Sequence, residues 1–155
     1  STNEAVNQAL IEGAVGGIVA ADCKIGRMTY WAANATVPVY EISFRIVMTN
    51  VSSKPVTLSG DNFATTLDGT PIPPFNFSAR DVGDADIWRT YDSLTIRPGE
   101  ERSIALAYEI SQPTYDSWYK SSRTVAVSFT CGNQRVTYTK NSRSDEITVS
   151  DIETL

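Results

Sequence analysis

Residues 40–50, YEISFRIVMTN, decide the fold class of this chain. Every second residue from Tyr40 to Met48 is large and apolar, whereas most of the residues between them are polar or charged. Successive side chains of an extended strand point to opposite faces, so this pattern predicts a strand with one face in a core. The same alternation recurs in residues 103–110 and 124–131, which indicates a chain built mainly from strands.

Turn-forming residues separate these predicted strands. Gly132 and Asn133 join residues 124–131 to residues 135–140 as a two-residue hairpin, and Pro98 and Gly99 precede residues 103–110. Residues 146–149 fit a short last strand. Strands that are separated by turns about every ten residues are typical of sandwiches and barrels. We therefore predict an all-β, immunoglobulin-like β-sandwich of about seven to nine strands with an N-terminal extension.

The beginning of the chain follows a different pattern. Residues 4–12 fit a short helix that ends before Gly13, whereas residues 10–21 also fit an extended segment with one face of apolar or very small residues. A strand is favoured for residues 14–25, because glycine disfavours helix and valine and isoleucine favour strands. We expect residues 1–22 to form the extension and residues 23–155 to form the sandwich.

Composition excludes several functional classes. The chain has 155 residues, a net charge of −5 and 13 basic residues that occur singly, so no basic face for nucleic acid is expected. The chain has no histidine, which removes the commonest general base and the commonest transition-metal ligand. No apolar run reaches the about 18 residues that a membrane helix needs. We expect a protein that is not an enzyme, needs no cofactor and does not span a membrane.

The two cysteines are far apart in sequence. Strand alternation places Cys23 with Val19 and Cys131 with Val127 on core-facing sides. A disulfide between them and a pair of buried thiols are both compatible with this placement. A disulfide is the favoured interpretation, and it implies an oxidising compartment and an extracellular or cell-surface location.

Two clusters are candidate binding sites. An acidic cluster surrounds Gly83 and fits either a calcium loop or a solvated turn, and it consists of Asp81, Asp84 and Asp86. The solvated turn is favoured, so no metal site is assigned. Tyr115, Trp118 and Tyr119 follow Pro113 and fit either an aromatic platform for a sugar or protein, or a cap over one end of the sandwich. Three glycosylation sequons are also present, at Asn34, Asn50 and Asn76.

Several motifs carry a resemblance to a known class of domain. They are TNVSSKPV at residues 49–56, DNF at 61–63, LDG at 67–69 and LTIRPGE at 94–100. With these motifs, the segment from residue 40 to about residue 131 resembles the telokin-like, immunoglobulin-type domains of exported bacterial and archaeal proteins. The resemblance implies a sandwich fold and an exported protein, and it implies no particular ligand.

A second resemblance is local. Residues 16–25, GGIVAADCKI, resemble the first core strand of chaperone–usher pilins, in which an N-terminal extension completes the sandwich of the neighbouring subunit. In pilins the two cysteines are usually much closer in sequence than Cys23 and Cys131. The resemblance implies a donor segment with five assembly residues, namely Leu10, Ile11, Val15, Ile18 and Val19.

Two functional hypotheses follow. The first is a structural subunit of an extracellular filament or pilus, with other copies of the chain as partners. The second is a monomeric or dimeric ectodomain that binds a cell-surface protein, S-layer or carbohydrate ligand. Residues 1–22 distinguish the two: packing on their own sandwich favours the ectodomain, and insertion into a neighbour favours the filament.

Overall fold

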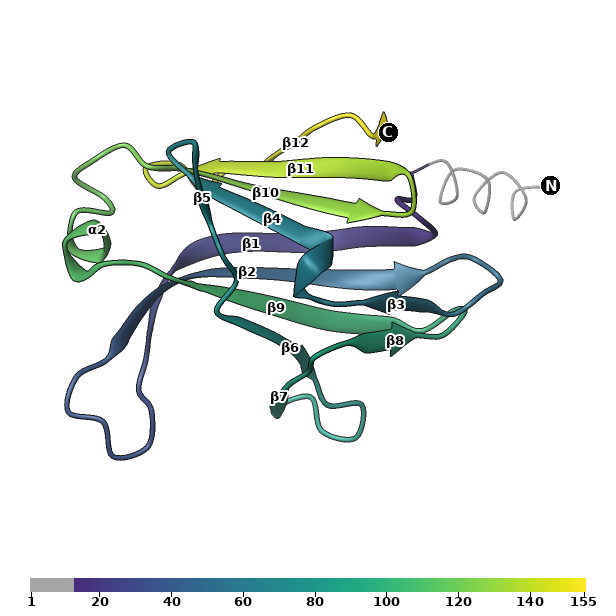
Figure 1. The fold of residues 1–155 in the computed structure, drawn as a ribbon, viewed down its shortest axis with the longest axis horizontal. Helices are drawn as coiled ribbons and strands as arrows, with labels where there is room; N and C mark the ends of the chain where they lie inside the picture. Colours follow the sequence, from purple (N-terminus) through teal and green to yellow (C-terminus); the bar gives the residue numbers. More distant parts are fainter. Residues whose placement is uncertain (1–12) are drawn as a thin grey trace.

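The computed structural model describes residues 13–155 as two antiparallel sheets that face each other (Figure 1). The first sheet holds, in order, β1 (Ile18–Tyr30), β2 (Val39–Asn50), β9 (Glu101–Glu109), β6 (Asn76–Arg80) and β7 (Trp88–Thr90). The second holds β12 (Thr148–Val149), β11 (Gln134–Asn141), β10 (Thr124–Cys131), β4 (Phe63–Leu67) and β5 (Thr70–Ile72), with β13 (Glu153–Thr154) also paired to β11. A separate two-stranded ribbon joins β3 (Val56–Leu58) to β8 (Leu94–Ile96).

The core lies between the two sheets. The alternating apolar side chains of β2 and β9 face inward, and Phe44 and Ile104 are fully buried. Phe129 and Tyr138 face them from β10 and β11. Phe63 links the layers, because its ring lies 5.9 Å from that of Phe44 and is also close to that of Phe129. Burial of this apolar surface is the dominant stabilising contribution to the fold.

A tight turn anchors the described start of the chain. Gly16 and Gly17 both have positive φ angles, +57° and +85°, which glycine adopts without a Cβ clash. Val15 and Ile18 are joined across this turn by two backbone hydrogen bonds of 2.9 and 3.0 Å. Both side chains are buried in the core of their own sandwich. β1 begins at Ile18, so the expected boundary between residues 22 and 23 falls within a strand.

The all-β sandwich prediction is confirmed. The described residues contain thirteen strands, more than the number predicted, because several strands of two or three residues pair along the edges. Two helical turns were not predicted: a 3-10 turn at Gly60–Asn62 and α2 at Gln112–Asp116. A serine begins each of them: Ser59 accepts a hydrogen bond from the Asp61 backbone N–H, and Ser111 from that of Thr114.

The preference for a disulfide was wrong, because Cys23 and Cys131 are free thiols in the structure. Cys23 lies within an irregularity of β1, where the register against β2 shifts between Ala21 and Lys24. Cys131 ends β10, and its Sγ lies 3.7 Å from the carbonyl oxygen of Gly16. Burial raises the pKa of the Cys23 thiol to about 12, which keeps it protonated.

Candidate functional site

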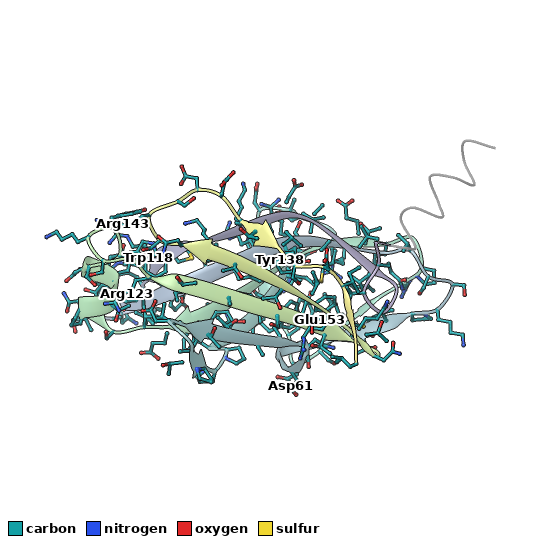
Figure 2. All side chains as sticks on the ribbon, turned by 90° about the horizontal axis from the view of Figure 1, so that it is seen from above. Asp61, Trp118, Arg123, Tyr138, Arg143 and Glu153 are labelled. Carbon is teal, nitrogen blue, oxygen red and sulfur yellow. The ribbon has the colours of Figure 1, made fainter. Side chains whose placement is uncertain are left out.

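The aromatic cluster after Pro113 closes one end of the sandwich. The guanidinium carbon of Arg27 lies 4.4 Å from the ring centre of Tyr115 and 4.6 Å from that of Tyr119. Tyr115 also packs on Tyr40, with ring centres 4.9 Å apart. Trp118 lies at the α2 end of the molecule (Figure 2) and is only 1% exposed. Its placement on a ligand surface was wrong, because its indole belongs to the core, whereas Tyr119 is 62% exposed.

The acidic cluster lies in the loop between β6 and β7. The Asp81 carboxylate forms an ion pair with Arg89 and accepts a hydrogen bond from the Gly83 backbone N–H. The Asp84 carboxylate accepts a hydrogen bond of 3.0 Å from the Asp86 backbone N–H. These contacts order the loop. Among residues 13–155, no three His, Cys, Asp or Glu side chains are grouped so that they could hold a metal ion.

The three sequons lie in different environments. Asn34 is exposed in the loop between β1 and β2. Asn76 is half-buried on β6. Asn50 is fully buried, and its amide donates hydrogen bonds to the carbonyl oxygens of Lys54 and Ile96 at 2.8 and 2.9 Å. The glycosylation prediction for Asn50 is therefore wrong for the folded chain, since its amide nitrogen is inaccessible.

A different surface has the features of a binding site, namely the outer face of the five-stranded sheet. Pairing places Ser43, Ala107 and Asn76 in one row across β2, β9 and β6. The next row runs through Ala105 and Ser78. These outward positions carry small side chains, so they leave two hollows above the backbone. We call them the aromatic hollow, of about 390 Å³, and the basic hollow, of about 280 Å³.

Aromatic and polar side chains surround the aromatic hollow. Its lining comprises Tyr30, Glu41, Phe75, Asn76, Ser78, Trp88, Thr90 and Ala107. Tyr30 is 50% exposed and Phe75 is 49% exposed, so both present ring surface to solvent. Hydroxyl and amide groups lie on the floor between them. A concave site with apolar walls and a few polar groups is the usual form of a small-molecule or saccharide site.

Two exposed apolar side chains, Tyr30 and Phe75, line this hollow, and further ones lie in the connections from which its lining residues come. Among the described residues, nine large apolar side chains are exposed, and six of them belong to residues 30–37 and 75–87. In Figure 1, the β1–β2 and β6–β7 connections both extend below the sandwich, on the same side of the view. A contiguous pair of exposed rings such as Tyr30 and Phe75 is more typical of an interaction surface than singly scattered apolar side chains are.

Glu41 is the unusual residue of the aromatic hollow. It is 5% exposed, yet within the described chain its carboxylate forms no hydrogen bond or ion pair. Burial raises its pKa above the ordinary value of 4.5. Glu109 lies directly opposite on β9 and is exposed. The Glu41 oxygens are not among the fully buried polar atoms without a partner in the described chain, so this partly desolvated carboxylate remains open to hydroxyl or amide donors from a ligand.

Three cations line the basic hollow, namely Lys24, Arg45 and Arg80. Trp88 lines both hollows and holds two of them: the guanidinium carbons of Arg45 and Arg80 each lie 5.2 Å from its ring centre. Asp22 also lines this hollow, but no ion pair joins it or any other described carboxylate to the three cations.

A third cavity, of about 370 Å³, opens between the two sheets at the edge formed by β1, β11 and β12. We call it the edge cavity. Most of its lining is apolar and includes Val15, Ile18, Cys23 and Ile147. Gly13, the first described residue, lies at this cavity. Leu10 and Ile11, two of the five predicted assembly residues, lie outside the described residues.

The other three predicted assembly residues belong to their own sandwich. Val15 and Ile18 are buried, and Val19 pairs with Thr49 of β2. Their prediction as residues inserted into a neighbour is wrong, because the turn at Gly16 returns the chain to its own core.

Sequence reasoning missed Tyr30, Phe75 and Trp88. Two features could have indicated this surface. Trp88 pairs with Arg80, so both side chains point to the outer face, and apolar residues flank the acidic loop. The direction in which Trp88 points depends on β7, and a strand of three residues is too short to be recognised from alternating polarity.

Comparisons with known proteins add no functional assignment. No family model matches the chain, and no curated protein matches it. A β-sandwich protein of Clostridium difficile, described as uncharacterized, is similar in structure, with 15% identity over 80% of this chain and 83% of that one and a TM-score of 0.47. A protein of Archaeoglobus fulgidus has 12% identity over 86% and 98% of the two chains and a TM-score of 0.37. A functionally unknown protein of Listeria monocytogenes has 12% identity over 76% and 78% and a TM-score of 0.38.

Helices long and apolar enough to cross a membrane do not occur within residues 13–155.

Proposed function

We propose that this protein is a non-catalytic, extracellular binding module that holds a glycan on the outer face of its five-stranded sheet. The observation that carries the proposal is the aromatic hollow, where exposed rings of Tyr30 and Phe75 flank a polar floor. A sugar ring has apolar C–H faces and hydroxyl edges, so it matches a site with aromatic walls and hydrogen-bonding groups.

Glu41 supports this type of ligand. Its partly desolvated carboxylate accepts no hydrogen bond within the described chain, and two vicinal sugar hydroxyls could donate to it in place of water. Asn76 and Thr90 line the same hollow and both donate and accept hydrogen bonds. An apolar peptide segment over the hollow would remove water from these groups without replacing its hydrogen bonds, which is costly.

The test is a panel of soluble polysaccharides in affinity electrophoresis, followed by calorimetry with each polymer that retards the protein. We expect Tyr30→Ala and Phe75→Ala each to weaken binding by about tenfold or more, as for central aromatic anchors. Tyr119→Ala is the matched control, because Tyr119 is exposed at the α2 end of the molecule. Equal affinity of all three variants, or no retardation by any polymer, would refute the proposal.

Reaction products are followed in the same panel. The proposal of a non-catalytic module predicts that no polymer is shortened during prolonged incubation. Because Glu41 and Glu109 lie opposite each other on the outer face, this assay examines the carboxylate pair directly. Release of reducing ends that Glu41→Gln abolishes would replace the binding module with a glycoside hydrolase.

A second candidate function is self-assembly into a surface filament, which the edge cavity favours. We propose for this case that residues 1–12 of one copy occupy the edge cavity of another, because these residues directly precede Gly13 and include Leu10 and Ile11. β1 is an edge strand of its sheet, so it offers backbone groups for pairing. Light scattering of the full chain beside a variant without residues 1–12 tests this candidate. Polymers from both or neither would contradict it.

A further inference from the structure

We propose that the basic hollow binds the anionic substituent of an acidic sugar, a carboxylate or a sulfate, so that the ligand of this module is an anionic polysaccharide. This inference rests on the proposed glycan-binding function and assigns its ligand class. It stands on the arrangement of Lys24, Arg45 and Arg80 around Trp88.

Local charge at the basic hollow is opposite to that of the whole chain. The chain carries a net charge of −5, yet three cations and one carboxylate line this hollow. Three arginines elsewhere in the described chain, Arg89, Arg123 and Arg135, each pair with a carboxylate. Lys24, Arg45 and Arg80 have no such partner among the described residues, so their donors are available to an anion.

Trp88 holds the two guanidinium groups in place. Arg45 and Arg80 each lie 5.2 Å from its ring centre, although β2 and β7 are separated by two strands. A guanidinium over an aromatic ring loses rotamer freedom before the ligand arrives, which lowers the entropy cost of binding. Its planar fork also matches a carboxylate or a sulfate in a bidentate geometry.

The two hollows form one elongated site. Trp88 lines both, so the basic hollow adjoins the aromatic hollow. Along β2, Arg45 and Glu41 are four residues apart, or about 13 Å at the usual strand rise. This separation places the ligand's anionic group beside Arg45 and neutral hydroxyl groups beside Glu41. A polymer with an acidic group on one sugar and hydroxyls on its neighbour therefore satisfies both ends.

The experiment compares four probes by calorimetry at low salt: polygalacturonate, its fully methyl-esterified form, dextran sulfate and unmodified dextran. We expect at least one acidic polymer to bind about tenfold or more tightly than its uncharged counterpart, and the difference to shrink as salt is added. The two pairs of probes distinguish the anions: polygalacturonate against its methyl ester tests for a carboxylate, and dextran sulfate against dextran tests for a sulfate.

Matched variants locate the effect. Lys24→Gln removes an exposed cation from the basic hollow, and Lys120→Gln removes an exposed cation from the loop after α2 with the same change in net charge. We expect Lys24→Gln to weaken binding of the acidic probe about three- to tenfold and to leave the uncharged probe unaffected, while Lys120→Gln changes neither. Equal losses in the two variants would mean non-specific attraction and would overturn the inference.

Failure of this inference is distinguishable from failure of the proposed function. If uncharged polymers from the wider panel bind with sensitivity to Tyr30→Ala, and the acidic forms bind equally or more weakly, the glycan-binding function stands and the acidic ligand class is wrong. If neither charged nor uncharged polymers bind, both are wrong.

Discussion

The guanidinium carbon of Arg45 on β2 lies 5.2 Å from the ring centre of Trp88 on β7, across the two strands that separate them in the sheet. The contact spans the sheet because small residues, including Ala105 and Ser78, occupy the outward positions between them. Trp88 consequently borders both hollows of the outer face. One residue of a three-residue edge strand thus connects an aromatic site with a basic one.

Replacement of Asn50 is expected to destabilise the fold. Its side chain donates to two backbone carbonyls and accepts from the backbone N–H and the hydroxyl of Ser52. Asn50→Ala removes these bonds and leaves buried backbone groups unpaired, so we expect the free energy of unfolding to fall by about 1–3 kcal/mol in urea denaturation. Asn34→Ala is the control, because Asn34 is exposed in a loop. Equal stability of the two variants would contradict the role of Asn50.

The turn at Gly16 gives a second prediction. A methyl group on Gly16 would lie 2.5 Å from the Sγ of Cys131, and the positive φ of +57° adds backbone strain. We expect Gly16→Ala to lower the free energy of unfolding by about 1–3 kcal/mol. Gly69→Ala isolates the strain alone, since Gly69 has a φ of +84° with no heavy atom within 4 Å of the added carbon. A larger loss in Gly69→Ala than in Gly16→Ala would show that the turn does not pack on Cys131.

Thiol chemistry checks the correction about the cysteines. Free thiols predict that reduction leaves the mass of the purified protein unchanged. Since burial raises the pKa of Cys23 to about 12, little thiolate forms near neutral pH, and native alkylation of Cys23 should be slow. Peptide mapping after iodoacetamide treatment, with and without urea, measures both properties. A mass that rises on reduction by two hydrogens would instead indicate the disulfide.

Glu41 predicts a pH dependence of stability. Its folded pKa lies above the ordinary 4.5, so the folded state holds this proton more tightly than the unfolded state does. This contribution is fully present below pH 4.5 and is lost as the pH rises through the folded pKa. Glu41→Gln cannot ionise, so we expect it to be more stable than the natural chain near pH 7 and to lose that advantage in acid.

Urea denaturation at several pH values measures the difference between the two chains. Glu146→Gln serves as control, because Glu146 is exposed in the loop before β12. A natural chain that is more stable than Glu41→Gln at pH 7 would show that the Glu41 carboxylate has a donor partner.

The fold was predictable because period-two alternation is strong where one strand face is buried. Residues 40–50 and 124–131 were assigned to strands directly, and β2 and β10 lie there. The assignment of Val15, Ile18 and Val19 to a donor segment was wrong, because an apolar pattern fits insertion into a neighbouring subunit as well as it fits packing in the chain's own core. The turn at Gly16 and Gly17 distinguishes the two possibilities, because it hydrogen-bonds Val15 to Ile18 and keeps both residues in their own sandwich.

The candidate site was harder to predict than the fold. The sequence around Trp118 and Trp88 does not distinguish a buried side chain from an exposed one. In the structure Trp118 is in the core, whereas Trp88 borders the outer face of the five-stranded sheet. The difference arises from α2, which turns Trp118 inward, and from the pairing of β7 with β6, which turns Trp88 outward beside Arg80. Both are tertiary outcomes of short elements, and local residue patterns do not encode them.

The most direct test of the central claim is an amide NMR titration of the isotope-labelled protein with the polysaccharide that binds most tightly in the panel. The account predicts chemical-shift changes concentrated on the outer face of the five-stranded sheet, at Tyr30, Phe75, Asn76 and Thr90. Changes confined to the edge cavity, around Val15 and Ile147, or to the loop that carries Tyr119, would contradict it.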